Sequence, residues 1–175
     1  RLADAERALA EDHEGDRTML PAIPAQLALL RSQLAGLQGD SITAIAQARL
    51  ARDLVPVGLP ADAEATLRGT ATALLGVALV RSGDLDAAAD AYEAALPDLR
   101  VGGNTLAVGR SVGDLAAIAI ARGDPGRAVR LCETELERSS AGSTTANPAV
   151  WAAMARARAE LGQVELADLA ARRAL

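Results

Sequence analysis

Two residues of this sequence belong to types that often carry chemistry: His13, the single histidine, and Cys132, the single cysteine. A histidine transfers protons or binds a metal, and a thiolate acts as a nucleophile, but each needs partner residues to do so. A helical pattern ends near His13, and no histidine lies near Cys132 in the sequence. We therefore expect His13 at a solvated helix end and Cys132 as a buried, unreactive thiol.

The charged residues do not form a catalytic or nucleic-acid-binding pattern. The chain has 23 acidic and 18 basic residues, a net charge of −5, and the two signs are interleaved. No two carboxylates are spaced for acid–base catalysis, and no basic patch is present to bind phosphates. The Gly-Asp steps lack the lysine of a phosphate-binding loop. We expect no catalytic residue, metal site or cofactor in this chain, and no direct contact with nucleic acid.

The Gly-Asp steps instead predict tight turns between helices. Four turn glycines recur at intervals of 44, 40 and 39 residues, and an alanine follows each one five residues later: Gly39, Gly83, Gly123 and Gly162. Glycine takes the positive φ that ends a helix, and the aspartate that follows three of them can cap the next helix. The alanine is expected where the two helices cross closely. Each unit is therefore predicted to be a helix, a turn and a second helix.

The composition agrees with an all-α fold. Half of the residues are apolar, alanine and leucine dominate, and Tyr92 and Trp151 are the only aromatic residues. Alanine and leucine favour helices, whereas the residues that favour strands are scarce. The expected helices span 1–13, 22–37, 41–55, 62–81, 85–99, 104–121, 125–138, 148–161 and 164–175. They form one domain over 1–175, with a partial unit at about 1–13 and full units at about 22–55, 62–99, 104–138 and 148–175.

Stacked helix pairs of this kind form a curved α-solenoid with a concave groove lined by the first helices. Counting back from the turn glycines places polar side chains on that groove at Gln26, Gln33, Thr70, Arg110 and Arg156. Asp114 lies four residues after Arg110, where it could pair with it on one helix face. The other groove positions are small or aliphatic: Ala73, Val77, Val80, Gly113, Ala117 and Ala152.

A mainly apolar groove with a few polar groups suits a small organic effector or a partner's helix. The alternative for Arg110 and Arg156 is that they are ordinary solvated arginines or link adjacent helices. For Tyr92 and Trp151 we expect packing between helices, the alternative being a place at the rim of a binding site.

The units resemble tetratricopeptide repeats. The second unit has the small and aromatic residues of that family at matching spacings: Gly76, Gly83, Ala88, Tyr92 and Ala95. The fourth unit has Trp151, Gly162, Ala167 and Ala174, and the first has Gly39, Ala44 and Ala51. The third keeps Gly123 and Ala128 but has Cys132 in place of the aromatic and Glu135 in place of the alanine. The resemblance implies a right-handed superhelix of about four helix pairs.

The units repeat at a longer period than the usual 34 residues of the family, and this points to one subfamily of these repeats. The segments 67–69, 74–78 and 81–85 look like the repeat region of the large ATP-dependent LuxR-type (MalT-like) transcription regulators. In that family the region follows an ATP-binding module, precedes a DNA-binding helix-turn-helix, senses an inducer or an inhibitory partner, and takes part in self-association. This chain contains neither flanking module, so the resemblance implies a regulatory sensor domain. The alternative is a scaffold that binds a protein partner without a small-molecule effector.

The ends and the compartment complete the expectations. The chain begins in a helical pattern and ends at Arg172-Arg173-Ala174-Leu175 without a helix-ending residue, so we expect a fragment of a larger protein. The helix over 1–13 would then be the second helix of an incomplete pair. No run of 18 apolar residues predicts a membrane span, and one cysteine permits no intramolecular disulfide, so we expect a cytoplasmic protein.

Overall fold

The computed structural model describes residues 20–141 and 147–175, and the helix expected over 1–13 lies outside them. Every element within the described residues is helical. After a short 3-10 helix, η1 (Leu20–Ala22), they are α2 (Ile23–Leu37), α3 (Ser41–Asp53), α4 (Ala61–Ser82), α5 (Leu85–Val101), α6 (Thr105–Ala121), α7 (Pro125–Ala141), α8 (Pro148–Glu160) and α9 (Val164–Arg173). The prediction of an all-α protein is confirmed over these residues.

The predicted helix boundaries agree closely with the structure. The eight helices expected after residue 20 are all present, and the largest difference is at the end of α7, predicted at 138 and found at Ala141. Helix α5 continues to Val101 and so includes Pro97, which the prediction also placed inside the helix.

The turns between the helices of each pair have the predicted geometry. The four turn glycines have φ values of 80°, 87°, 76° and 71° in the order Gly39, Gly83, Gly123 and Gly162. The aspartate after each of the first three accepts a hydrogen bond from the backbone N–H three residues later, at 3.0, 3.0 and 2.8 Å. The aspartate oxygens thus serve as acceptors for backbone N–H groups of the first helical turn, which have no acceptor within the helix.

The alanines that follow these turns lie at the predicted helix crossings. Ala44, Ala88 and Ala128 are at most 1% exposed. Ala167 is only half-buried, because α9 makes its main contacts with α8 alone among the described helices.

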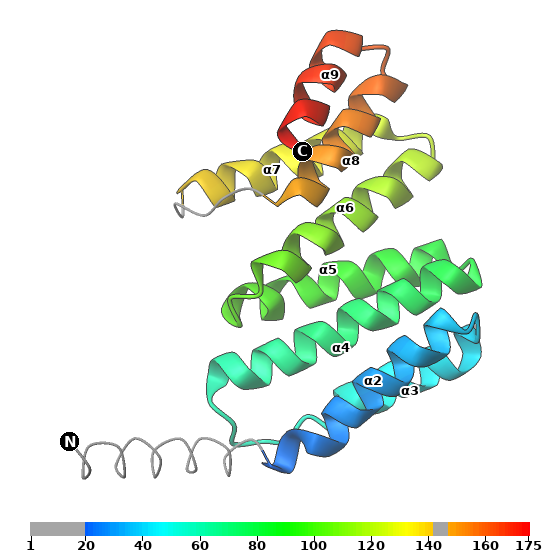
Figure 1. The fold of residues 1–175 in the computed structure, drawn as a ribbon, viewed down its shortest axis with the longest axis vertical. Coiled ribbons are helices and arrows are strands. Elements are labelled where there is room, and N and C mark those ends of the chain that lie inside the picture. Colours follow the sequence, from blue (N-terminus) through cyan, green and yellow to red (C-terminus); the bar gives the residue numbers. More distant parts are fainter. Residues whose placement is uncertain (1–19, 142–146) are drawn as a thin grey trace, which may run out of the picture.

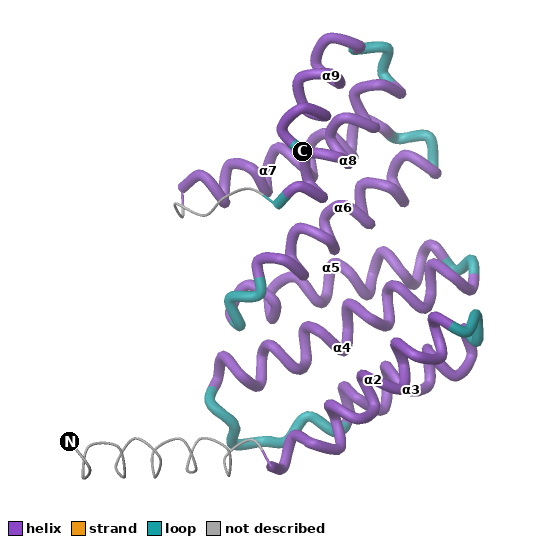
Figure 2. The backbone as a smooth tube through the Cα atoms, viewed as in Figure 1, coloured by secondary structure: helices purple, strands orange, loops and turns teal. Residues whose placement is uncertain are grey.

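The helices are stacked in chain order along the longest axis of the molecule, with α2 and α3 at one end and α8 and α9 at the other (Figure 1). Each helix runs back along the one before it (Figure 2). Each second helix packs on the first helix of the next pair, as α3 does on α4, α5 on α6 and α7 on α8. The first helices also contact one another in the order α2, α4, α6 and α8.

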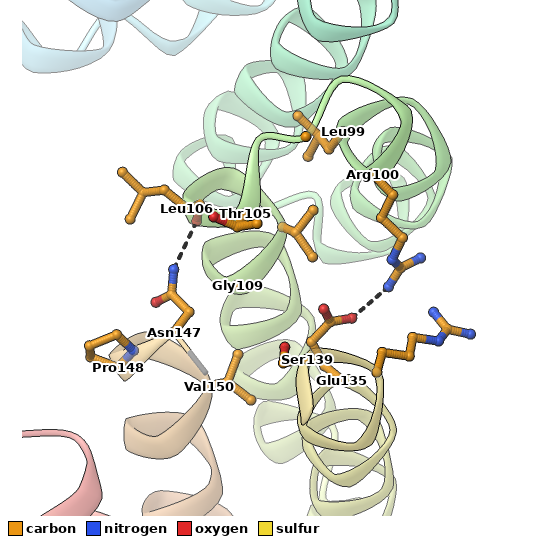
Figure 3. Close-up of a pocket in the computed structure, with 13 residues that line it drawn as sticks. Leu99, Arg100, Thr105, Leu106, Gly109, Glu135, Ser139, Asn147, Pro148 and Val150 are labelled. Atoms are coloured by element: carbon orange, nitrogen blue, oxygen red, sulfur yellow. Dashed lines mark hydrogen bonds and ion pairs between the residues drawn. The ribbon is translucent and has the colours of Figure 1, made fainter. Parts of the chain in front are cut away.

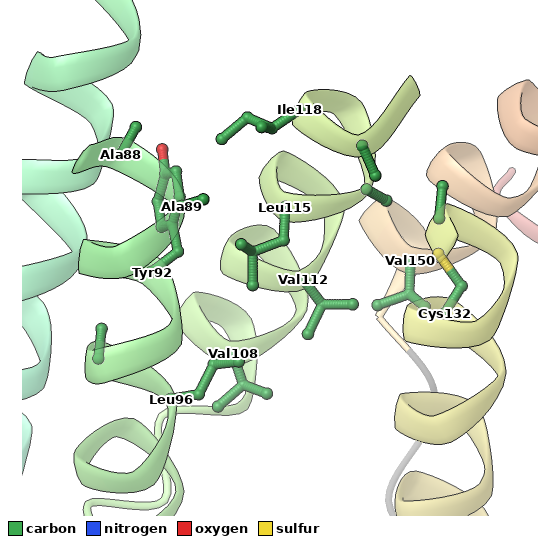
Figure 4. Close-up of a cluster of buried hydrophobic side chains, with 14 of the residues drawn as sticks. Ala88, Ala89, Tyr92, Leu96, Val108, Val112, Leu115, Ile118, Cys132 and Val150 are labelled. Atoms are coloured by element: carbon green, nitrogen blue, oxygen red, sulfur yellow. The ribbon is translucent and has the colours of Figure 1, made fainter. Parts of the chain in front are cut away.

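The main core lies between α5, α6, α7 and α8. Figure 4 shows Tyr92 and Leu96 of α5 facing Val112 and Leu115 of α6, with Cys132 of α7 beyond them. Most other core side chains are alanine, so neighbouring helix backbones approach closely. A Cβ atom on Gly69 of α4 would lie only 2.8 Å from the backbone nitrogen of Leu99.

Helix α4 has the length and apolar composition of a membrane-spanning helix. It has 22 residues and a mean hydropathy of 1.2 over its most apolar window, half of which is buried in the fold. It packs on α2, α3, α5 and α6. A central core helix has the same properties, so this is weak evidence for a membrane span.

Candidate ligand-binding pocket

A pocket of about 360 Å³ lies between the first helices α2, α4 and α6, with one residue each from α3 and α5. Half of its wall is small or apolar: Gly36, Leu37, Ala44, Ala73, Leu74, Val77, Ala78 and Ala107. The polar side chains are Ser32, Gln33, Thr70, Arg81, Tyr92, Arg110, Ser111 and Asp114. A concave, largely apolar site with a few polar groups is the usual form of a small-molecule site.

The pocket is elongated along α4. It extends from Thr70 to Arg81, which are eleven residues apart and therefore separated by about 16 Å along the helix axis. Thr70 and Arg110 are equivalent in their units, because each precedes its turn glycine by 13 residues. The polar groups of α6 therefore lie beside Thr70 at one end of the pocket, and Arg81 lies at the other.

Tyr92 reaches the pocket from α5 because α4 has a glycine opposite its ring. A Cβ atom on Gly76 would lie 2.9 Å from Cε1 of Tyr92, closer than real contacts allow. The ring is 2% exposed and packs directly on the backbone of α4. Its hydroxyl lies close enough to the carboxyl group of Asp114 on α6 to interact with it. One side chain therefore connects three helices at the base of the pocket.

The electrostatics of Asp114 follow from its burial. Partial burial raises the pKa of its carboxyl group above the usual value, although the Tyr92 hydroxyl and the charge of Arg110 act in the opposite direction. Burial also raises the pKa of Tyr92, and the negative charge of Asp114 adds to that effect. Tyr92 thus remains a neutral donor, and Asp114 is a carboxylate that ionises less readily than an exposed one.

The two arginines of the pocket differ in their contacts. Arg81 donates from Nη1 to the backbone oxygen of Gly36, at the end of α2. Arg110 is exposed and, within residues 20–141 and 147–175, forms no hydrogen bond or ion pair. The expected pair between Arg110 and Asp114 is therefore absent from the described residues. Asp114 instead interacts with Tyr92, while the charge of Arg110 acts on its carboxyl group without forming an ion pair.

The structure places four of the six predicted site residues in this pocket: Gln33, Thr70, Arg110 and Asp114. Gln26 lies on the first turns of α2 and does not line the pocket. Arg156 is exposed on α8, which contributes nothing to the pocket. The pocket is lined by residues of α2 to α6 only, so the predicted residue on α8 lies outside it.

Sequence reasoning missed Ser32, Arg81 and Ser111 as pocket residues and assigned Tyr92 to the core. Tyr92 is in fact buried, and only its hydroxyl end reaches the site. Ser32 donates to the backbone oxygen of Ala44 at 2.9 Å. These three residues lie on the same first helices, α2, α4 and α6, at distances from the turn glycines that the sequence count did not select.

A second cavity of about 390 Å³ lies between the end of α5, the start of α6, α7 and the start of α8 (Figure 3). Its central charged groups are already paired, since Arg100 Nη2 lies 2.7 Å from Glu135 Oε2. Asn147 donates to the backbone oxygen of Leu106 at 3.3 Å. The rim reaches Ser139 and Asn147, on either side of the undescribed residues 142–146. The pocket between α2, α4 and α6 is therefore the better-defined candidate.

The other candidate residues have the following positions. Cys132 is fully buried, and burial together with the charge of Glu133 raises the pKa of its thiol to about 12, as expected for an unreactive cysteine. His13 lies outside the described residues. Trp151 packs partly on the core, and the guanidinium of Arg173 lies 4.8 Å from its ring centre. Among the described residues no group of three or more His, Cys, Asp or Glu side chains is placed to hold a metal ion.

Comparisons with known proteins show the fold alone. No protein-family profile matches the chain, and no curated protein sequence matches it. Among solved structures, the crystal structure of BtubC (BKLC) from P. vanneervenii is similar over 99% of this chain and 70% of its own, with a TM-score of 0.69 and 21% identity. At this identity the likeness extends to the arrangement of the helices and not to function.

Proposed function

We propose that this chain is a right-handed α-solenoid of tetratricopeptide-like helix pairs and the sensor domain of a LuxR-type (MalT-like) transcription regulator. In this proposal the pocket between α2, α4 and α6 binds an effector, and the domain takes part in self-association. The domain acts in the cytoplasm by binding and performs no catalysis. It contacts neither nucleic acid nor membrane through these residues.

The order of helix contacts supports the solenoid. Neighbouring pairs contact each other through a second helix and the next first helix, and the first helices contact one another along the stack. This nearest-neighbour packing is the defining property of repeat arrays. The glycine turns and buried crossing alanines recur from unit to unit, as the repeat pattern requires.

The pocket is the observation that carries the sensor proposal. Its volume of about 360 Å³ suits a small organic molecule, and it joins residues of three successive units. A ligand there would contact α2, α4 and α6 at once. Because these helices belong to different pairs, the ligand would favour one spacing of the units over others, which is how binding can change the shape of the array.

The test is a thermal-unfolding screen of the purified chain against a broad set of metabolites. A ligand that binds only the folded state raises Tm in proportion to its saturation. We expect at least one compound to raise Tm, and the effect to be lost in Arg110→Ala and kept in Arg156→Ala. Arg156 is a matched control because it is also an exposed arginine on a first helix but lies outside the pocket. If the two variants respond alike, the pocket is not the effector site.

A second candidate function is a scaffold for a partner's helix, favoured by an apolar stripe on α2. Five exposed side chains recur at the 4-3-4-3 spacing of a helix–helix seam, on the face of α2 opposite its buried residues: Ile23, Leu27, Leu30, Leu34 and Leu37. They are 44% to 80% exposed. This spacing suits an amphipathic helix with leucines at the same intervals.

The two functions are separated by variants at different places. A scaffold predicts a stoichiometric partner whose binding is abolished by Leu30→Glu and kept in Arg110→Ala, and no metabolite that raises Tm. A sensor predicts a metabolite that raises Tm, and this effect should be abolished by Arg110→Ala and kept in Leu30→Glu. Circular dichroism would check that Leu30→Glu still folds, which we expect because Leu30 is 60% exposed.

A further inference from the structure

We infer that the pocket between α2, α4 and α6 binds an organic monoanion with an elongated apolar body, whose acidic group lies at Arg110. This inference rests on the proposed function, because it names the class of the effector. Three features carry it: the charges around the pocket, the unpaired state of Arg110, and the apolar wall along α4.

The charged side chains of the pocket favour an anion. Two guanidinium groups, those of Arg81 and Arg110, line it together with a single carboxyl group, that of Asp114. The lining therefore carries one more positive than negative charge. Burial also disfavours the ionised form of Asp114, and its carboxyl group already interacts with the Tyr92 hydroxyl. A cationic ligand would meet two arginines and only this one carboxylate.

Arg110 is the guanidinium available to a ligand. Seven other arginines of the described chain form ion pairs with carboxylates: Arg52, Arg68, Arg100, Arg122, Arg127, Arg158 and Arg172. Arg81 is held by the backbone oxygen of Gly36. Arg110 alone among the pocket's charged side chains has no such partner in the described residues. A planar guanidinium can receive a carboxylate in two parallel hydrogen bonds.

The space beside Arg110 fits an apolar body. From the polar end at Thr70, the α4 wall continues through Ala73, Leu74, Val77 and Ala78 before it reaches Arg81. No charged group lines this stretch of α4. A ligand whose acid lies at Arg110 would therefore place its hydrocarbon part along the α4 wall, where contact with the side chains removes apolar surface from water.

The test uses three eight-carbon probes that differ only in the head group: octanoate, octan-1-ol and octylammonium. Binding to the purified chain is measured by titration calorimetry at pH 7.5, below the concentrations at which the probes form micelles. We expect octanoate to bind about tenfold or more tightly than octylammonium, because a carboxylate can accept hydrogen bonds from the Arg110 guanidinium whereas an ammonium group is repelled by it. Arg110→Ala should lose that difference, and Arg156→Ala should keep it.

Asp114→Asn gives an independent readout, because it removes the one negative charge near the acidic group. We expect it to tighten octanoate binding by roughly threefold, because the like charge that repels the acidic group is removed. Equal or stronger binding of octylammonium would overturn the inference, as would full retention of octanoate binding in Arg110→Ala or weaker binding in Asp114→Asn.

The failure of this inference can be told apart from failure of the sensor proposal. If octanoate does not bind, but a neutral or cationic metabolite from the broad screen raises Tm in an Arg110-dependent manner, the ligand class is wrong and the sensor stands. If no compound of either set binds, both proposals fail.

Discussion

The ring of Tyr92 on α5 packs directly against the backbone of α4 at Gly76. A Cβ atom on Gly76 would lie 2.9 Å from that ring. This contact lets the tyrosine hydroxyl pass α4 and meet Asp114 on α6. The interaction of Tyr92 with Asp114 therefore depends on the absence of a side chain at residue 76 of α4.

Substitution of that glycine is the first prediction. Gly76→Ala should destabilise the fold by about 1–3 kcal/mol, because the added methyl group forces the buried ring to move. It should also weaken ligand binding, since Tyr92 would no longer hold Asp114 in place. Urea denaturation measures the first effect and calorimetry the second.

Gly126→Ala is the matched control for that substitution. Gly126 also lies in a helix, but the nearest atoms to an added Cβ are at 3.4 and 3.5 Å and belong to side chains. The control should be neutral or more stable by up to about 1 kcal/mol, because alanine favours helix over glycine. Equal stabilities for the two variants would show that α4 tolerates a side chain at residue 76.

The interaction between Tyr92 and Asp114 can be measured by a double-mutant cycle. Tyr92→Phe should cost about 1 kcal/mol by removing the donor to a partly buried carboxylate, and it should cost much less in an Asp114→Asn background. Urea denaturation of the four proteins at pH 7 gives the coupling free energy. A coupling near zero would mean that the hydroxyl and the carboxyl act independently.

The raised pKa of Asp114 predicts a pH dependence of stability. Because the folded-state pKa lies above the unfolded value, the carboxyl binds a proton more strongly in the folded state. The contribution of this carboxyl group to the stability of the fold is therefore fully present below its pKa in the unfolded chain, near 4. That contribution is lost as the pH rises through its higher pKa in the folded protein. Asp114→Asn should remove this pH dependence, with Arg110 and Tyr92 as the groups that face residue 114.

The measurement is the free energy of unfolding at pH 4 and pH 7 for both proteins. The free energy of unfolding of Asp114→Asn, taken relative to that of the wild type, should be larger at pH 7 than at pH 4. Asp168→Asn is a control, because the Asp168 carboxylate is exposed and pairs with Arg172 within α9. A wild-type difference that Asp114→Asn leaves unchanged would assign the pH dependence to other carboxylates.

Cys132 should not react in the folded protein. With a thiol pKa of about 12, only about one ten-thousandth of it is thiolate at pH 8, and the sulfur is fully buried. A disulfide reagent should therefore label it at the rate of unfolding in buffer and at once in urea. Equally fast labelling under both conditions would show that α7 opens locally.

The pair of Arg100 and Glu135 predicts an asymmetry between two truncations. Glu135 is 9% exposed and lies 2.7 Å from the Arg100 guanidinium. Arg100→Ala leaves a buried carboxylate without its partner and should cost about 3 kcal/mol, whereas Glu135→Ala removes that carboxylate and introduces the residue that the other repeats favour. The expected order of urea midpoints is wild type, Glu135→Ala, then Arg100→Ala, and a reversed order would contradict it.

The sequence by itself determined the helices and their turns. A left-handed residue such as Gly83 and a side chain such as Asp84 that caps the next helix act within a few residues of their own position. Such signals are local, and their physical effect does not depend on the rest of the chain. For the same reason the buried alanines Ala44, Ala88 and Ala128 could be predicted from their distance to the turn.

Only the tertiary structure decided which polar residues share a site. Gln33, Thr70, Arg110 and Asp114 could be assigned to one row of helices from the repeat, and the structure brings them to one pocket. The pocket also includes Arg81, and the packing of Tyr92 on Gly76 makes Asp114 interact with the tyrosine rather than pair with Arg110. These relations depend on how closely three helix backbones approach one another, and that distance is set by packing across the whole stack rather than by local sequence.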